Sequence, residues 1–315
     1  MQPICAKLEA SPPRANDAQL RCVRVVRVHT AIMRRITFLA VFAFAATLLV
    51  VTGRVAIASD LPFQFANGFI RIEARVAQST QPLHLLLDSG AEVSLLSLRT
   101  ARRLHLKLGA QIRVIGVDAD SVAYRVDGVR ATVGGVPLGR LSLVADFPGA
   151  DELCGAPVDG IVGVEFFRDR VVQIDYPRRC LRLLSQFPAG EMAECLPLLW
   201  QHGVLCAPVM VNGSQPRWTR LDTGCNDALH WVVPRANSKA RRHGMSVGFL
   251  TDARDMSLTS VALGGQVIPA VKTALHGRAL FPGEAGLLGN GLLSRFGVVT
   301  IDTAHHRLFL HNPPD

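Results

Sequence analysis

The chain has 315 residues, 49% of them hydrophobic, and a formal net charge of +9. Eight basic and two acidic residues fall within residues 1–59, which leaves a net charge of only +3 for residues 60–315. Because the basicity is concentrated in the first segment, the composition does not favour a nucleic-acid-binding protein. The 256 residues from position 60 onward are enough for one large core or two smaller ones.

The N-terminal segment has the layout of a secretory signal peptide. Two arginines precede the mostly apolar stretch 36–51, and small residues follow at 56–59. We expect cleavage near these small residues and export to the periplasm or the cell exterior. The alternative is an uncleaved signal anchor, which would be the chain's one membrane contact, but 36–51 is short for a span of roughly 20 residues. Residues 33–59 are therefore interpreted as the signal peptide, and residues 1–32, which lack a globular pattern, as a non-native or disordered extension.

Five of the seven cysteines lie beyond this segment. An exported protein can oxidise such residues, and Cys195 and Cys206, which flank a predicted hairpin, form the expected pair. There is no Cys-x-x-Cys motif and no His/Cys spacing typical of zinc, so no zinc site is expected.

The remainder of the chain contains an internal duplication. Four sequence blocks recur in the same order. LPFQFANG (61–68) matches LPLLWQHG (196–203), and STQPLHLLLDSG (79–90) matches GSQPRWTRLDTG (213–224). VRATVGGVPL (129–138) matches TSVALGGQVIPA (259–270), and DGIVGVEFFRDRVVQID (159–175) matches AGLLGNGLLSRFGVVTID (285–302). This predicts two copies of one unit, which we assign to residues 60–190 and 191–315.

Each copy reads as mainly β. Short alternating or apolar runs such as 69–76 and 171–176 are separated by Gly, Pro, Asp and Asn, and further alternation at 180–184 and 307–311 predicts a hairpin that closes each copy. Short helices are predicted at 96–109, 163–169 and 289–296. The expected fold class is all-β, with two pseudo-symmetric barrels or sandwiches and few helices.

Two aspartates occupy matching positions, each at the end of a predicted strand. Asp88 follows LHLLL, and Asp222 lies 134 residues further on, after a related run. A carboxylate at the end of a buried strand costs several kcal/mol unless it is paired or hydrogen-bonded. We therefore expect the two copies to meet about a pseudo-two-fold axis, so that both carboxyls share one proton. One pKa then rises and the other falls, which provides a general acid and a general base in one site.

The neighbours of the aspartates fit this arrangement. Glycine permits a tight turn and close backbone approach, hydroxyls can bond across to the opposite turn, and a later glycine after two apolar residues can pack beneath. In the first copy these residues are Gly90, Ser89 and Gly163, and in the second copy they are Gly224, Thr223 and Gly289.

The doubled motif, Asp-Ser/Thr-Gly followed at a distance by two hydrophobic residues and Gly, resembles the two-lobed aspartic peptidases of the pepsin and retropepsin-like superfamily, in particular an exported bacterial member. The resemblance covers residues 61–315. It implies two six-stranded-type β-barrel lobes with a cleft between them, and endopeptidase activity on peptides or unfolded proteins. It also implies that Asp88 and Asp222 activate a water molecule without metal or cofactor. With both lobes in one chain, a monomer is sufficient.

The resemblance further implies a hairpin flap over the cleft. In the first copy the candidate is 114–126, with Asp118 and Ser121 at its tip and Tyr124 on the returning strand; Tyr124 reads equally well as a partly exposed strand residue. The second copy offers 248–259.

Two positions depart from the family pattern. Arg220 lies two residues before Asp222, on the same strand face; its guanidinium either approaches the aspartates and lowers their pKa, or points away and pairs with another acid. Cys225 stands where the first copy has Ala91, and a thiol nucleophile served by His230 is the less favoured alternative to a packed cysteine. Because of these departures, a non-catalytic peptide- or protein-binding member of the same fold remains the second hypothesis.

Overall fold

The computed structural model describes residues 60–115, 120–188, 192–233, 255–277, 281 and 283–311. All of them belong to one of the chain's two compact units, Ala56–Asp315. The predicted extension at 1–32 and signal peptide at 33–59 lie outside the described residues. Within the described ranges, no helix is long and apolar enough to cross a bilayer.

The first half contains ten strands and three short helices in the described residues. In chain order they are β1 Leu61–Ala66, β2 Phe69–Val76, β3 Leu83–Leu87, β4 Leu95–Ser97, α2 Leu98–Arg103, β5 Gln111–Ile115, β6 Asp120–Val133, β7 Val136–Ala145, α3 Ala150–Cys154, β8 Gly160–Val162, the 3-10 helix η1 Val164–Phe166, β9 Val171–Asp175 and β10 Cys180–Leu184.

Six of these strands close into a ring in the order β2, β3, β8, β4, β7, β6, because β6 pairs back onto β2. Strand β3 runs parallel to β8, and β4 runs parallel to β7. Strand β5 extends the ring as a hairpin with β6. Alternating or fully apolar runs form these strands because a closed barrel buries one face of every strand.

The second half repeats this architecture. Its described elements are β11 Glu194–Pro197, β12 Leu199–Gln201, β13 Val204–Val211, β14 Arg217–Asp222, β15 Leu229–Val232, β16 Asp255–Leu263, β17 Gln266–His276, β18 Gly286–Gly289, α4 Asn290–Leu293, the 3-10 helix η2 Ser294–Phe296, β19 Val298–Asp302 and β20 Arg307–Leu310.

Its ring follows the order β13, β14, β18, β15, β17, β16, and β16 closes onto β13. The pairing β14–β18 is parallel, like β3–β8 in the first half. The predicted fold class, all-β barrels with a few short helices, is confirmed. The predicted domain boundary between 190 and 191 falls at residues outside the described ones and stays a prediction.

The helix predictions were right in place; the one at 289–296 matches α4 and η2, η1 is shorter than 163–169, and the one at 96–109 was much too long. Ser97 caps α2 by accepting a hydrogen bond from the Thr100 N–H, but the helix ends at Arg103. His105 has a positive φ, and the Gly109 N–H then donates to the Arg125 carbonyl of β6. The prediction of helix up to 109 was therefore wrong, because the chain turns to join the barrel.

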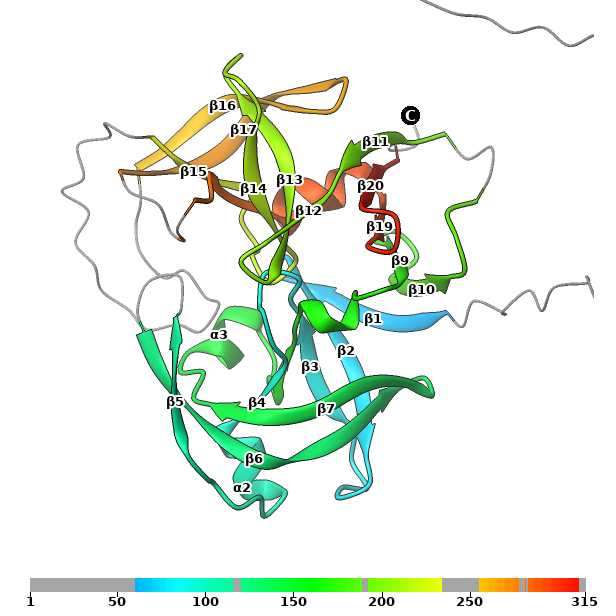
Figure 1. The fold of residues 1–315 in the computed structure, drawn as a ribbon, viewed down its shortest axis with the longest axis vertical. Coiled ribbons are helices and arrows are strands. Elements are labelled where there is room, and N and C mark those ends of the chain that lie inside the picture. Colours follow the sequence, from blue (N-terminus) through cyan, green and yellow to red (C-terminus); the bar gives the residue numbers. More distant parts are fainter. Residues whose placement is uncertain are drawn as a thin grey trace, which may run out of the picture. The chain divides into compact units, whose positions relative to one another are not determined.

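The two halves share a sheet. The predicted hairpins β9–β10 and β19–β20 both form, and β9 pairs antiparallel with β19 (Figure 1). The register is symmetric about the pair Gln173–Thr300, whose side chains are hydrogen-bonded at 3.2 Å. A pseudo-two-fold axis therefore passes through this pair and relates the two halves of the chain.

None of the five cysteines in the described part of the chain forms a disulfide. The predicted Cys195–Cys206 pair was wrong. Cys195 lies opposite Phe309 in the shared sheet, whereas Cys206 lies opposite Leu199 in the second barrel. Between the two cysteines the chain passes from β11, which pairs with β20, to β12, which pairs with β13 in another sheet.

Candidate active site

Asp88 and Asp222 stand at the ends of corresponding strands. Asp88 follows β3 and donates its backbone N–H to the Val162 carbonyl of β8 at 2.9 Å. Asp222 is the last residue of β14 and lies opposite Gly289 of β18. Both carboxylates are buried, with exposed fractions of 4% and 7%. The strands before them, LHLLL in the first half and RWTRL in the second, are largely buried and carry each aspartate into the interior.

Each aspartate is held by the turn that follows it. The N–H groups of Gly90 and Ala91 donate to Asp88 Oδ1 at 2.9 and 3.0 Å. The Gly224 N–H donates to Asp222 Oδ1 at 2.9 Å. Such bonds to a carboxylate stabilise its charged form and fix its orientation.

The two turns interlock through Ser89 and Thr223. The Ser89 N–H donates to Thr223 Oγ1 at 2.9 Å, and the Thr223 N–H donates to Ser89 Oγ at 3.1 Å. In addition, the Ser89 hydroxyl donates to the Leu221 carbonyl and the Thr223 hydroxyl to the Leu87 carbonyl, both at 2.8 Å. All four bonds are buried and cross between the halves, so each turn fixes the position of the other.

Interlocking brings the carboxyls together. A methyl group added at Gly90 would lie 2.5 Å from Asp222 Cγ, and one added at Gly224 would lie 2.4 Å from Asp88 Cγ. Each aspartate therefore packs on the glycine of the opposite turn, which explains why no larger residue fits there. This packing brings the two carboxyls close enough for each to affect the pKa of the other.

The surroundings give the two aspartates different pKa values. Burial raises the pKa of both, and for Asp222 the nearby negative charge of Asp88 adds to the rise, so that its pKa stands well above the usual value. For Asp88 the rise in pKa is opposed by the hydrogen bond from Asp222, by the N–H of Gly90 and by the charge of Arg220. Asp222 is therefore the carboxyl that keeps a proton more readily, and Asp88 is the one that ionises more readily.

Gly163 and Gly289 support the turns from below. A side chain at Gly163 would lie 2.7 Å from the Val93 carbonyl carbon, and one at Gly289 would lie 2.7 Å from the Cys225 carbonyl oxygen. These glycines lie in direct contact with the segments that follow each turn, as the sequence predicted.

Arg220 is buried beside this pair and combines both alternatives left open by the sequence. It forms a two-pronged salt bridge with Glu284, so it does pair with another acid. Its positive charge also acts on both aspartates, where it opposes the rise in pKa that burial causes.

Both ring nitrogens of His230 contact residues other than Cys225. Its Nδ1 contacts His276 Nε2 at 3.0 Å, and its Nε2 contacts Asp227 Oδ2 at 2.9 Å. Since both ring nitrogens are engaged elsewhere, the contacts do not support the thiol nucleophile, and the buried Cys225 fits the packed alternative.

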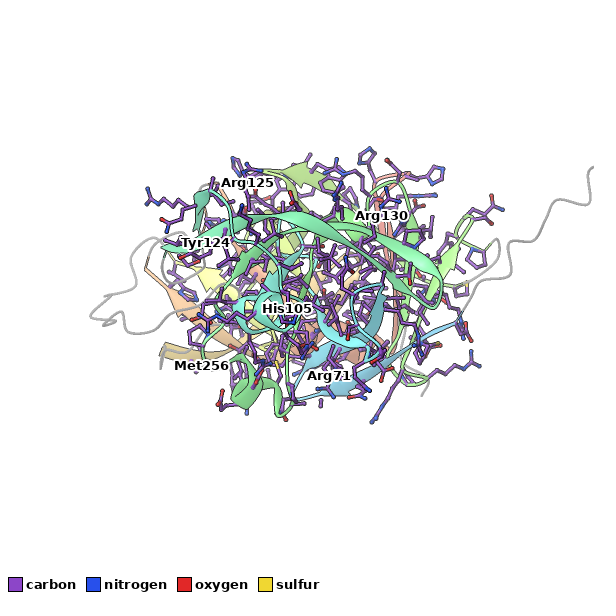
Figure 2. All side chains as sticks on the ribbon, turned by 90° about the horizontal axis from the view of Figure 1, so that it is seen from below. Arg71, His105, Tyr124, Arg125, Arg130 and Met256 are labelled. Atoms are coloured by element: carbon purple, nitrogen blue, oxygen red, sulfur yellow. The ribbon has the colours of Figure 1, made fainter. Side chains whose placement is uncertain are left out.

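The candidate flap is described only in part. Asp118 lies outside the described residues, as does the second copy's hairpin up to residue 254. Ser121 and Tyr124 lie on β6, opposite Val114 and Gln111 of β5, and Figure 2 shows Tyr124 beside Arg125 on that strand. The β5–β6 hairpin exists as expected, but its role as a flap stays a prediction.

Asn290 is a site residue that the sequence reasoning missed. Its side-chain amide donates to the carbonyls of Thr223 and Gly68 at 2.6 and 2.9 Å, and its Oδ1 accepts from the Tyr176 hydroxyl at 2.8 Å. It thus ties the Asp222 turn to the first half. A polar residue directly after the apolar Leu-Leu-Gly run was the available signal.

Comparison with known proteins gives two matches. Residues 72–166 match the family model described as aspartyl protease. The structure is similar to the crystal structure of aspartic proteinase from Irpex lacteus, with a TM-score of 0.51 and 13% sequence identity over 81% of this chain and 97% of that chain. At this identity the likeness concerns the fold. None of the curated proteins compared with the chain is significantly similar to it.

Proposed function

Because the family match and the fold confirm the resemblance to the pepsin and retropepsin-like aspartic peptidases, we propose that this chain is an aspartic endopeptidase with Asp88 and Asp222 as its catalytic pair. The observation that carries the proposal is a pair of buried carboxyls, each packed on the glycine of the opposite turn and held by interlocked turns from both halves. A buried pair of this kind is costly to maintain and is suited to moving protons.

The proposed reaction begins with a water molecule between the carboxyls. The ionised Asp88 accepts a proton from this water as its oxygen attacks the scissile carbonyl carbon, while Asp222 donates its proton to the carbonyl oxygen. The tetrahedral diol that results breaks down as a proton passes to the leaving amine. The four buried bonds between the turns keep both carboxyls aligned during these transfers.

The mechanism requires one proton on the pair. Activity is lost at low pH, when Asp88 also becomes protonated, and at higher pH, when Asp222 loses its proton. Because the pKa of Asp222 is raised further than that of Asp88, the activity profile is bell-shaped, with its upper limb well above the ordinary range of an aspartate.

The test is cleavage of an unfolded protein substrate by the purified protein from acid to neutral pH. We expect Asp88→Asn and Asp222→Asn each to abolish cleavage, and Asp146→Asn, at an exposed aspartate of the same half as Asp88, to leave it unchanged. If the wild type binds peptides with an affinity that Asp222→Asn does not alter and cleaves nothing, the non-catalytic alternative replaces the proposal.

We also propose that the protein is exported. The support is the charged, apolar and small-residue pattern of residues 33–59. N-terminal sequencing of the protein recovered from a secreting host tests it. A mature chain that begins near residue 59 or 60 is the expected result, and recovery with residues 33–59 intact contradicts cleavage.

A further inference from the structure

Arg220 makes three side-chain hydrogen bonds in a buried site. Its Nε and one terminal nitrogen donate to the two carboxylate oxygens of Glu284, both at 2.7 Å. The guanidinium carbon lies 3.5 Å from the ring centroid of Phe281. Arg220 and Glu284 are 4% and 3% exposed. The two-pronged pairing and the ring leave the guanidinium with one fixed orientation.

The third bond crosses to the other half. The remaining terminal nitrogen of Arg220 donates to the Gly90 carbonyl at 2.8 Å. Gly90 is the glycine of the Asp88 turn, and its N–H donates to the Asp88 carboxylate. The same residue also packs on the Asp222 carboxyl. Arg220 therefore holds a residue that contacts both aspartates.

The first half shows that the fold does not require this ion pair. Leu86 lies opposite Ile161 as Arg220 lies opposite Leu287, so Leu86 is its counterpart. Val158, three residues before Ile161, corresponds to Glu284, three residues before Leu287. Leu86 and Val158 pack in one buried apolar cluster. Since a buried ion pair is often replaceable by apolar residues without loss of stability, its presence beside Gly90 points to a role other than packing.

We infer that Arg220, oriented by Glu284, is a positioning residue that fixes the Gly90 carbonyl and thereby holds the Asp88 turn against Asp222. This role rests on the proposed function, because it matters where the two carboxyls must stay in one geometry during proton transfer. The same cation stabilises the negative charge shared by the pair, so its removal is expected to raise the pKa of both carboxyls.

The test uses the first half as the template. Arg220→Leu combined with Glu284→Val rebuilds the apolar pair of Leu86 and Val158 and leaves no buried charge without a partner. Arg220→Lys keeps the charge but cannot bond Glu284 and Gly90 in the same planar arrangement. Arg217→Leu is the matched control, because Arg217 lies on the same strand and donates to the Val232 carbonyl instead.

Two measurements are made on each purified variant, namely kcat and KM against pH on an unfolded substrate, and the titration of the aspartate carboxyls by carbon-13 NMR. For the double variant we expect a melting temperature close to that of the wild type, a kcat lower by about 100-fold with KM little changed, and a carboxyl titration displaced upward by about one pH unit. For Arg220→Lys we expect about a tenfold loss in kcat with the titration unmoved. Arg217→Leu should change neither.

A double variant or Arg220→Lys that keeps the wild-type kcat overturns the positioning role, and an unmoved carboxyl titration in the double variant overturns the electrostatic part. If the wild type cleaves no substrate, the proposed function fails. The NMR arm then still decides whether Arg220 acts on the carboxyl pair, because it does not depend on turnover.

Discussion

The two halves of this protein use the same strand frame but surround their aspartates differently. In the first half Leu86 and Leu95 both lie opposite Ile161, in an apolar cluster. In the second half Arg220 and His230 both lie opposite Leu287. The backbone geometry thus tolerates either an apolar or an ionic lining, provided that every buried charge is paired.

The largest expected effect comes from placing a charge on the apolar side. Leu86→Arg puts an arginine where Val158 offers it no acid, and an unpaired buried charge costs about 3–5 kcal/mol. Urea unfolding should show this loss, whereas Leu86→Met should cost about 1 kcal/mol. Adding Val158→Glu to Leu86→Arg rebuilds the second half's pair and should recover part of the loss. A double variant no more stable than the single one would show that the halves are not interchangeable.

The interlock between the turns is expected to contribute next. Thr223→Val removes the acceptor for the Ser89 N–H and the donor to the Leu87 carbonyl, which leaves buried groups unsatisfied and costs about 1–3 kcal/mol each. Ser89→Ala should cost a similar amount, since Ser89 makes the reciprocal bonds. Thr223→Ser, which keeps the hydroxyl, is the control. Clearly unequal losses of stability in Thr223→Val and Ser89→Ala would mean that the two turns do not contribute equally to the interlock.

A smaller difference is expected between the aspartates themselves as the pH changes. The pKa of Asp222 is raised by burial and by Asp88, so the folded state binds its proton more tightly than the unfolded state and loses stability as the pH rises above the ordinary value near 3.9. Asp222→Asn removes this loss. Its melting temperature should exceed that of the wild type at neutral pH, and the gain should disappear towards pH 4. Each pKa unit of elevation corresponds to about 1.4 kcal/mol. Equal behaviour of Asp88→Asn would contradict the unequal assignment.

The smallest effect is expected at Cys225, the counterpart of Ala91. Cys225→Ala makes the two turns alike at this position and should change stability by about 1 kcal/mol or less and cleavage rate less than about twofold. Steady-state kinetics of the purified variant checks this. A loss of activity comparable to that of Asp222→Asn would revive the thiol nucleophile.

The sequence predicted those parts of the molecule that are encoded locally and twice. The duplicated Asp-Ser/Thr-Gly motif indicated turns that meet, because neither buried carboxylate is stable alone, and the two apolar residues before Gly163 and Gly289 indicated their support. The contacts of Arg220 were not predictable in the same way. Its partners Glu284 and Gly90 lie 64 and 130 residues away, and strand alternation gives only the face on which the guanidinium lies.

The misses have related causes. The Cys195–Cys206 prediction assumed a simple hairpin, but β11 and β12 belong to different sheets. The short helix α3, between two glycines with positive φ, is too short to carry helical periodicity. The pairing of β9 with β19 joins segments that each predict a hairpin equally well on their own. These features depend on tertiary packing between segments far apart in the chain, and a short stretch of sequence carries no information about that packing.

The strand pairing centred on Gln173 and Thr300 joins the two halves within one chain, and this determines how their association depends on protein concentration. Because both halves belong to one chain, they meet at an effective concentration set by the connecting segment rather than by the amount of protein in solution. Dilution therefore cannot separate the two acidic turns. The specific activity of the protein should stay constant down to the lowest concentration at which cleavage can be followed.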